Sequence, residues 1–313
     1  MWQRILEARN CPLTDGGIRR LCSNIDAIKS IETFNILGTK VSKNGMRMAL
    51  ESMPSLKDFC CNFPTQLLAK LSGTPLERLC SSASKIWLSS SRINNNALLE
   101  LLKLKELCQL QIHSRGDLGQ LSFNEGILPI LNKFGSSLTS LTISNLHQCP
   151  INIWAIVKNC QKLETLALVD IETISIEKSE DEQNPSKGMK IDPVLENLKR
   201  LHLKNCRHLT SEDLDLLLAS PALEELTLEE IDSANDVAFQ KAENVHQFRN
   251  LNSLMLICRN ATKVVIDMLM NDANPLKICR CHSCSSEDIR NWKSTAREKS
   301  WDCIFASCSH TGV

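Results

Sequence analysis

The chain has 313 residues, no tyrosine, and aromatic residues at only 4% of the total. No apolar run approaches the roughly 18 residues that a membrane-spanning helix needs. Basic and acidic residues balance at 36 each, so the formal net charge is zero. General attraction to nucleic acid or to an anionic membrane requires a basic excess. The composition therefore predicts neither a nucleic-acid-binding protein nor a membrane protein.

Motifs of catalysis and cofactor binding are also missing. The sequence contains no G-x-G-x-x-G, no G-x-x-x-x-G-K-[ST], no H-E-x-x-H and no G-x-S-x-G. The seven histidines are scattered, and no nucleophile and base can be paired from their spacing. We therefore expect no enzyme activity, no catalytic residue and no cofactor.

Cysteine, in contrast, is abundant, at 15 residues. The start, MWQRILEARN, carries charges where a signal peptide would need its apolar core. Most cysteines stand beside leucine positions, as small buried hydrophobic residues do. A reducing compartment is therefore favoured over a disulfide scaffold, and we expect a cytoplasmic or nuclear protein.

One cysteine cluster near the end of the chain resembles a metal site. The segment CRCHSC is followed by further thiol and imidazole groups, and the whole set is Cys279, Cys281, His282, Cys284, Cys303, Cys308 and His310. Zinc requires four such ligands in a tetrahedron, but this spacing is cramped and contains no clean pair of C-x-x-C motifs. We predict core or surface cysteines and no metal site, with zinc as the alternative.

The main pattern of the sequence is a leucine repeat. Leu198, Leu201 and Leu203 have the spacing L-x-x-L-x-L, and the same spacing returns 25 residues later, from Leu223 onward. This period and consensus indicate leucine-rich repeats, which stack into a curved solenoid because one repeat cannot bury its apolar edge alone. Further copies are IETFNI, LKDFCC, LCQLQI, LTSLTI, LETLAL, LNSLML and, as the last, LKICRC. Between residues 56 and 107 the register is ambiguous, and ASKIWL is favoured over LERLCS because it keeps the period near 25.

Each expected strand is followed by a stretch with helical spacing of its apolar residues, as in DGGIRRLC, NGMRMALESM and EDLDLLLA. The sequence thus predicts an α/β leucine-rich-repeat solenoid, or horseshoe, with parallel strands on the concave face and helices on the convex face. We expect one domain over residues 1–313 with about ten repeats. Residues 285–313 should form a C-terminal cap, and Trp2, Ile5 and Leu6 a short helix.

One connection is longer than the others. The repeat that starts at Leu163 spans 35 residues, and its excess is polar and rich in Glu, Asp and Lys. Such a segment cannot bury enough apolar surface to fold alone, so residues 170–194 are expected to form a mobile acidic insertion. It is either a tolerated surface loop or a partner-binding or phosphorylated loop, with Ser175, Ser179 and Ser186 as acceptors.

The segments CPLTDGGIRRLC and LKNCRHLTSEDL resemble the cysteine-containing class of leucine-rich repeat, with the consensus LxxLxLxxCxxLTDxGLxxLA. This class is typical of F-box proteins with leucine-rich repeats, which recruit substrates to cullin–RING ubiquitin ligases. The resemblance implies a substrate-recognition or adaptor subunit of such a ligase. Because the first repeat begins by residue 11, the sequence has no room for an F-box before it.

The repeats themselves predict a protein–protein interaction module. Side chains alternate along a strand, so the residues between the leucines form the concave face. The candidate binding residues are Trp87, His113, Arg200, His202, Lys204, Glu225, Glu229 and Met255, and Ser144 is also expected to point outward. The basic and acidic rows either pair within the molecule or form a docking surface with Trp87 and Met255 as exposed apolar anchors. The alternative function is a regulatory repeat protein that inhibits or scaffolds an enzyme outside the ubiquitin pathway.

Overall fold

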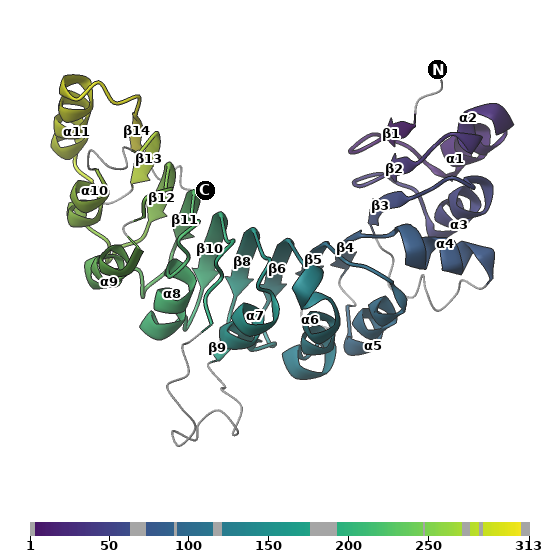
Figure 1. Ribbon diagram of the computed structural model, residues 1–313, viewed down its shortest axis with the longest axis horizontal. Helices are drawn as coiled ribbons and strands as arrows, with labels where there is room; N and C mark the ends of the chain where they lie inside the picture. The colour runs from purple at the N-terminus through teal and green to yellow at the C-terminus, as the bar shows by residue number, and fades with distance from the viewer. Residues whose placement is uncertain are drawn as a thin grey trace. The chain divides into compact units, whose positions relative to one another are not determined.

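The computed structural model describes residues 4–62, 73–90, 93–114, 121–175, 193–246, 248–270, 276–281 and 284–307. The chain divides into two compact units, Met1–Leu141 and Thr142–Val313. In each unit the described helices lie along one face of a parallel sheet and leave the other face uncovered (Figure 1).

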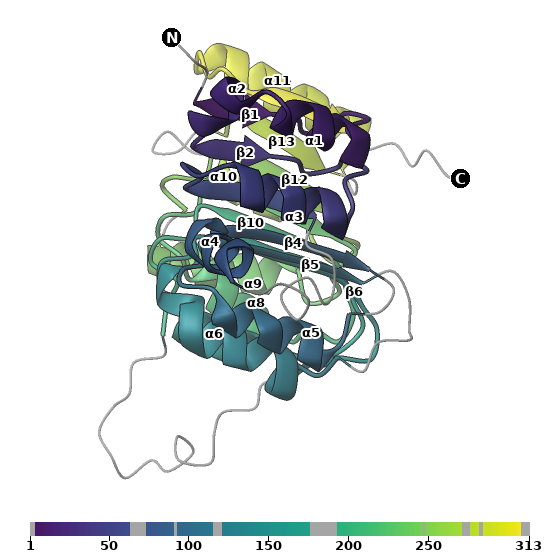
Figure 2. The same cartoon turned by 90° about the vertical axis from the view of Figure 1, so that its right-hand side faces the viewer.

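The strands of the first unit follow one another in the sheet in chain order. They are β1 (Ile5–Glu7), β2 (Thr33–Asn35), β3 (Asp58–Asn62), β4 (Lys85–Ser90) and β5 (Gln109–Ser114). All neighbours pair in parallel, which requires a crossover between each strand and the next. The helices of these crossovers are α1 (Asp15–Cys22), α2 (Ile25–Lys29), α3 (Lys43–Ser52), α4 (Thr74–Ser82), α5 (Asn95–Leu99) and α6 (Leu128–Phe134). The contacting helices α1 and α3 lie side by side in Figure 2.

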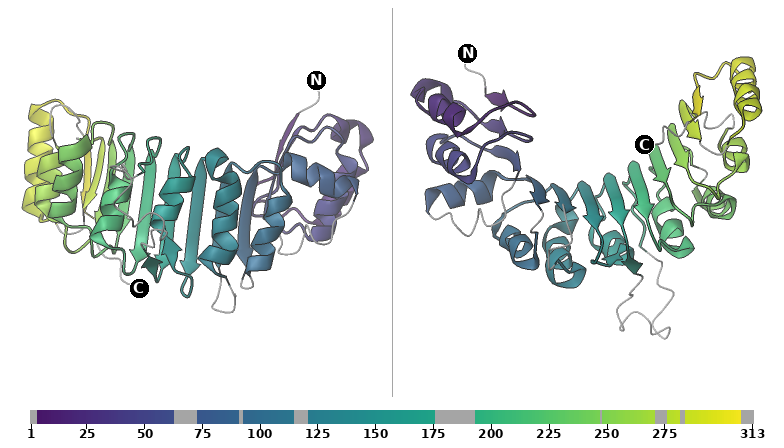
Figure 3. Two further views of the ribbon diagram at one scale, coloured as in Figure 1. Left: turned by 60° about the horizontal axis from the view of Figure 1, so that its bottom comes forward. Right: turned by 180° about the vertical axis from the view of Figure 1, so that it is seen from behind.

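Strand β6 (Ser140–Leu146) lies at the boundary, and the second unit repeats the same plan. Its further strands are β8 (Thr165–Ile171), β10 (Arg200–Cys206), β11 (Glu225–Glu229), β12 (Ser253–Ile257), β13 (Ile278–Cys281) and β14 (Ile304–Ser307). Its helices are α7 (Ile153–Asn159), α8 (Ser211–Leu218), α9 (Asp236–His246), α10 (Lys263–Leu269) and α11 (Ser286–Glu298). The green to yellow helices α8–α11 form a row on one side of these strands (Figure 3). The short strands β7 (Ile151–Asn152) and β9 (Ile174–Ser175) form a separate pair.

The core of each unit lies between the sheet and the helices. Leu201 and Leu203 of β10 are buried, and they pair in register with Leu226 and Leu228 of β11. Helix α8 closes the same layer with Leu214, Leu217 and Leu218, which are fully buried. Aliphatic side chains therefore fill layers that are too narrow for many aromatic rings, which explains the aromatic-poor composition.

The sequence predicted the alternation of strand and helix correctly. The three helical stretches coincide with α1, α3 and α8 to within one residue, and ASKIWL overlaps β4, whereas LERLCS lies in α4. Helix α8 begins with the capping box of Thr210 and Asp213, in which each side chain bonds to the other residue's backbone N–H.

Two expectations about the ends of the chain are wrong. Ile5 and Leu6 belong to β1 and not to a helix, because they pair with Thr33 and Phe34 of β2. LKICRC is not the last strand, because β14 pairs in parallel with β13. The proposed cap therefore contains a strand as well as α11, and Trp292 of α11 stacks on Phe305 of β14 at 6.0 Å between ring centroids.

Other expectations concern segments that lie wholly or partly outside the described residues. Residues 176–192 of the acidic insertion are among them, as are His282, Cys308 and His310 of the cysteine cluster. Cys284 is disulfide-bonded, which departs from the expectation of reduced cysteines, whereas Cys160 and Cys206 are buried and form no disulfide. Of the described helices, none has the length and apolar character needed to cross a membrane.

Candidate protein-interaction surface

The uncovered face of β8 and β10–β14 in the second unit carries six of the eight candidate residues, and we call it the strand face. The register places Arg200 opposite Glu225, and Lys204 opposite Glu229. His202 lies opposite Thr227, which is in turn opposite Met255. The leucines between them are buried, so the candidates of β10, β11 and β12 share one face.

The basic and acidic rows of this face are only partly paired. Lys204 Nζ lies 2.7 Å from Glu229 Oε2, and this contact raises the pKa of Lys204. Arg200 Nε instead donates to Thr165 Oγ1 at 3.1 Å. Among the described residues, neither Arg200 nor Glu225 has an ion-pair partner, although the two are adjacent in register. The pairing predicted for the rows thus holds at one end of the strands and leaves an exposed positive and an exposed negative group at the other.

His202 lies between these two ends and is half-buried. Its Nε2 atom is buried and has no hydrogen-bond partner among the described residues. Burial is the main cause that lowers the pKa of this imidazole, and the positive charge of Lys204 acts in the same direction against the opposing effect of Glu229. His202 is therefore held in its neutral form at the centre of the strand face.

Apolar side chains continue the strand face toward the end of the sheet. Met255 and Ile257 of β12 are half-buried, so Met255 is less exposed than expected. Ile278 of β13 and Ile304 of β14 are adjacent in register and are 39% and 64% exposed. Large aliphatic side chains gathered at the surface are typical of interaction sites.

Trp87 and His113, the other two candidates, belong to the first unit. They lie on the neighbouring strands β4 and β5, where Trp87 is opposite Gln111 and His113 is opposite Ser89. Trp87 is half-buried, since the Arg9 guanidinium lies 5.2 Å from the centroid of its ring. The indole is thus covered by a cation and is not the fully exposed anchor that the sequence predicted.

Ser144 of β6 is buried, contrary to expectation. The larger Val169, which has the corresponding place in β8, remains half-exposed. A serine hydroxyl lies close to the backbone, so neighbouring side chains cover it even at an outward position.

At the carboxyl end of four strands, one residue adopts the left-handed backbone conformation. These residues are Asn145, Asp170, Asn205 and Glu230, with φ of 56°, 53°, 46° and 56°. Asn and Asp tolerate this conformation, which costs other non-glycine residues about 1–2 kcal/mol. Asn205 Nδ2 also donates to Asp170 Oδ1 at 3.0 Å, which links two neighbouring positions. Glu230 is neither Asn nor Asp, and its side chain makes no hydrogen bond among the described residues.

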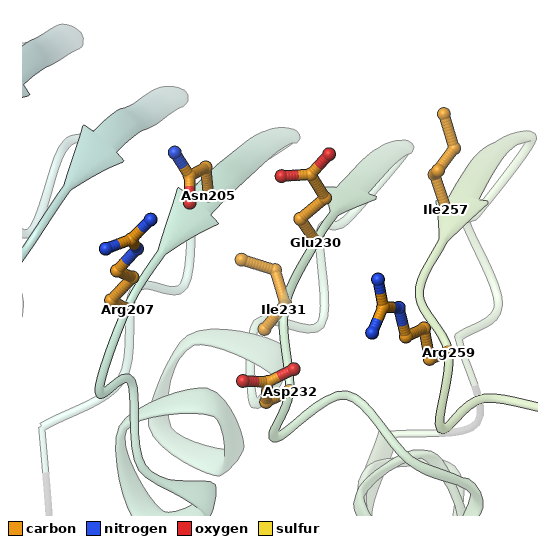
Figure 4. A pocket seen from close by; sticks show the side chains of 7 residues that line it. All are labelled: Asn205, Arg207, Glu230, Ile231, Asp232, Ile257 and Arg259. Atoms are coloured by element: carbon orange, nitrogen blue, oxygen red, sulfur yellow. The ribbon is translucent and has the colours of Figure 1, made fainter. Parts of the chain in front are cut away.

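A hollow of about 330 Å³ lies at this strand end, beside β10, β11 and β12, and we call it the strand-end pocket. Figure 4 shows Arg207 and Arg259 on either side of the segment that carries Glu230, Ile231 and Asp232. The remaining lining residues are Asn205 and Ile257. The pocket forms where the left-handed residues stop, since β12 has none at the corresponding place.

Sequence reasoning missed this pocket because it considered only positions within the strands. A signal was present, since Arg207, Asp232 and Arg259 recur once per repeat, directly after Cys206, Ile231 and Cys258. Within a strand, the alternation of side chains predicts which face a residue lies on. Residues just beyond a strand do not follow this alternation, so the turn decides whether they come together.

The parts of the chain that the structure describes contain no group of three or more His, Cys, Asp or Glu side chains that could hold a metal ion. The surfaces found above consist of exposed charges, amides and aliphatic groups, which suit recognition of another molecule.

No protein-family profile and no curated protein matches this chain. Among solved structures, it is similar to a chain in the crystal structure of the Rad7 and Elc1 complex in yeast, at 17% identity, with a TM-score of 0.54 and coverage of 87% of this chain and 76% of that chain. A Listeria monocytogenes internalin (InlF) covers 90% of this chain and 87% of its own length at 14% identity, with a TM-score of only 0.42. Together with the parallel strands and one-sided helices, the first similarity shows the fold, an α/β leucine-rich-repeat solenoid.

Proposed function

We propose that the chain is a non-catalytic protein-interaction module whose strand face binds a partner protein. The observation that carries this proposal is the arrangement of Arg200, Glu225 and Met255 on adjacent strands of a face that no described helix covers. Within the described ranges, Arg200 and Glu225 offer opposite charges without an ion-pair partner, and Ile278 and Ile304 add exposed apolar side chains on β13 and β14, opposite Ser253 in register. Interfaces combine such an apolar part with charges that orient the partner.

The test compares partner capture with stability for Arg200→Glu and Glu225→Lys. Both side chains are exposed, so each change should alter the free energy of unfolding by less than about 0.5 kcal/mol. Capture of a purified partner should fall by at least tenfold, because a reversed charge opposes docking. Arg19→Glu in α1 is a matched control for Arg200→Glu, since it makes the same charge change on the helical side of the first unit. Equal capture by all variants would exclude the strand face.

A ubiquitin-ligase role is the more specific proposal, and it is supported by the resemblance to F-box repeat proteins. In that role the strand face receives the substrate, and a cullin and a RING protein co-purify with the chain. The alternative is a regulatory protein that inhibits or scaffolds an enzyme. A stable one-to-one complex with an enzyme, in the absence of any cullin, would favour this alternative.

A further inference from the structure

We propose that the strand-end pocket binds an extended protein segment in which one basic side chain is flanked, two residues away on each side, by acidic side chains. This proposal rests on the proposed function, since it names a class of partner for the same unit. Its four charged residues, Arg207, Glu230, Asp232 and Arg259, lie beyond the strands and are not part of the strand face, whereas Ile257 of β12 belongs to both.

The first argument is that the charged groups of the pocket are available. Arg207, Glu230, Asp232 and Arg259 are exposed. In the described ranges, none of their side chains forms an ion pair or a hydrogen bond, although arginines and carboxylates stand on adjacent repeats. Their charges are therefore free to pair with a ligand.

Glu230 supplies a second and independent argument. The corresponding places in the preceding repeats hold Asn205, Asp170 and Asn145, whose short side chains suit the left-handed conformation. Glu230 has the same conformation with a longer side chain that makes no hydrogen bond among the described residues, although its backbone N–H donates to Ile257 O at 2.9 Å. A residue type that disfavours the backbone conformation it adopts is characteristic of a functional position. At this place Glu230 lines the pocket, and its carboxylate points away from the Ile231 side chain (Figure 4).

The order of the charges defines the ligand. Arg207 follows β10, Glu230 and Asp232 follow β11, and Arg259 follows β12, so the charges run positive, negative, positive across three strands. Adjacent strands are about 4.8 Å apart, which separates the two arginine backbones by about 10 Å. In an extended segment, residues four apart are separated by about 13 Å. The long arginine side chains can bridge the difference between this spacing and that of their own backbones. A segment with the pattern acidic-x-basic-x-acidic therefore places each charge opposite its complement.

The size and the charges of the pocket exclude other occupants. A hollow of about 330 Å³ accepts one long side chain, whereas a helix about 10 Å in diameter would not enter it. A phosphate group would be attracted by Arg207 and Arg259 but repelled by Glu230 and Asp232, which lie between them. The same repulsion disfavours a nucleic-acid backbone.

The experiment measures binding of synthetic heptapeptides to the full chain by fluorescence anisotropy at low ionic strength, with an uncharged dye on each peptide. Ala-Glu-Ala-Lys-Ala-Glu-Ala has the proposed order of charges. Ala-Lys-Ala-Glu-Ala-Glu-Ala has the same composition in another order. We expect the first peptide to bind about tenfold more tightly, as the sum of three exposed charge pairs. Equal affinity for the two peptides, or binding of inorganic phosphate in preference to both, would overturn the proposal.

Two double variants assign the binding to the pocket. Arg207→Glu with Arg259→Glu should abolish the preference for the first peptide. Arg19→Glu with Arg20→Glu makes the same change in net charge on α1 and should leave the preference intact. If both double variants weaken binding equally, the peptide responds to net charge alone and the proposal fails. Arg200→Glu should leave peptide binding unchanged, which separates a failure of this proposal from a failure of the strand face.

Discussion

Lys204 Nζ and Glu229 Oε2 form a 2.7 Å ion pair between adjacent strands, β10 and β11. Arg200 and Glu225, at the other end of the same two strands, are opposite each other in register without forming one. The two rows of charge therefore have two roles. One end joins the two strands by an ion pair, and the other leaves two exposed side chains of opposite charge, to which we propose that a partner binds.

The Lys204–Glu229 pair should contribute measurably to stability. Lys204→Glu or Glu229→Lys places like charges opposite each other and should lower the free energy of unfolding by about 0.2–1 kcal/mol. The double variant Lys204→Glu with Glu229→Lys restores opposite charges and should recover most of this loss. Urea unfolding of the three variants measures the effect. A double variant as unstable as the sum of the single ones would show that the pair has no such role.

Leu201 should be among the most sensitive core positions, because it is buried between Leu166 and Leu226 of the neighbouring strands. Leu201→Ala should cost about 2–5 kcal/mol, as truncation in a packed layer does. Thr227→Ala, on the half-exposed face of β11, should cost less than about 0.5 kcal/mol. Chemical unfolding of both variants checks the assignment of inward and outward positions. Similar losses at the two sites would contradict it.

Trp292 tests the prediction that residues 285–313 form a C-terminal cap. Its indole is 6% exposed, stacks on Phe305, and donates from Nε1 to Asp267 Oδ1 at 2.7 Å. Trp292→Ala should cost about 3–5 kcal/mol, and hydrogen exchange should increase first in β13 and β14. Uniform exchange over the whole second unit would indicate that the segment is part of one cooperative core.

His202 should make stability depend on pH. Burial lowers the pKa of this group in the folded chain, so in acid the unfolded chain takes up a proton that the folded chain resists. The contribution is present above the ordinary histidine pKa of about 6.5 and is lost as the pH falls through the lower folded value. His202→Gln should therefore flatten the decline of the melting temperature between neutral and mildly acidic pH. If the melting temperature of the variant declines as steeply as before, groups other than His202 cause the decline.

The buried thiols should resist alkylation. Burial raises the pKa of both Cys160 and Cys206 to about 12, so almost no thiolate forms at pH 8. With iodoacetamide and mass spectrometry, we expect modification of the half-buried Cys11 and Cys22 first and of Cys160 and Cys206 only after unfolding. Early modification of Cys206 would show that the layer behind β10 opens readily.

The sequence alone determined the repeat, the parallel strands, the helices between them and the inward direction of leucines such as Leu166, Leu201 and Leu226. These features follow from local spacing, because the side-chain period of a strand and of a helix is set by the backbone itself. The capping boxes of Thr210 and Ser285 are local in the same way, since each needs only four consecutive residues.

Only the tertiary structure decided the features that depend on neighbouring repeats. Ile5 and Leu6 form a strand because β2 supplies the backbone groups with which they pair, and Trp87 is covered because Arg9 reaches it from another repeat. The pairing of Lys204 with Glu229, and not of Arg200 with Glu225, depends on side-chain positions that the register does not specify. The strand-end pocket likewise arises where the left-handed turns of successive repeats end at Glu230. Such contacts join residues far apart in the chain, and local spacing carries no information about their geometry.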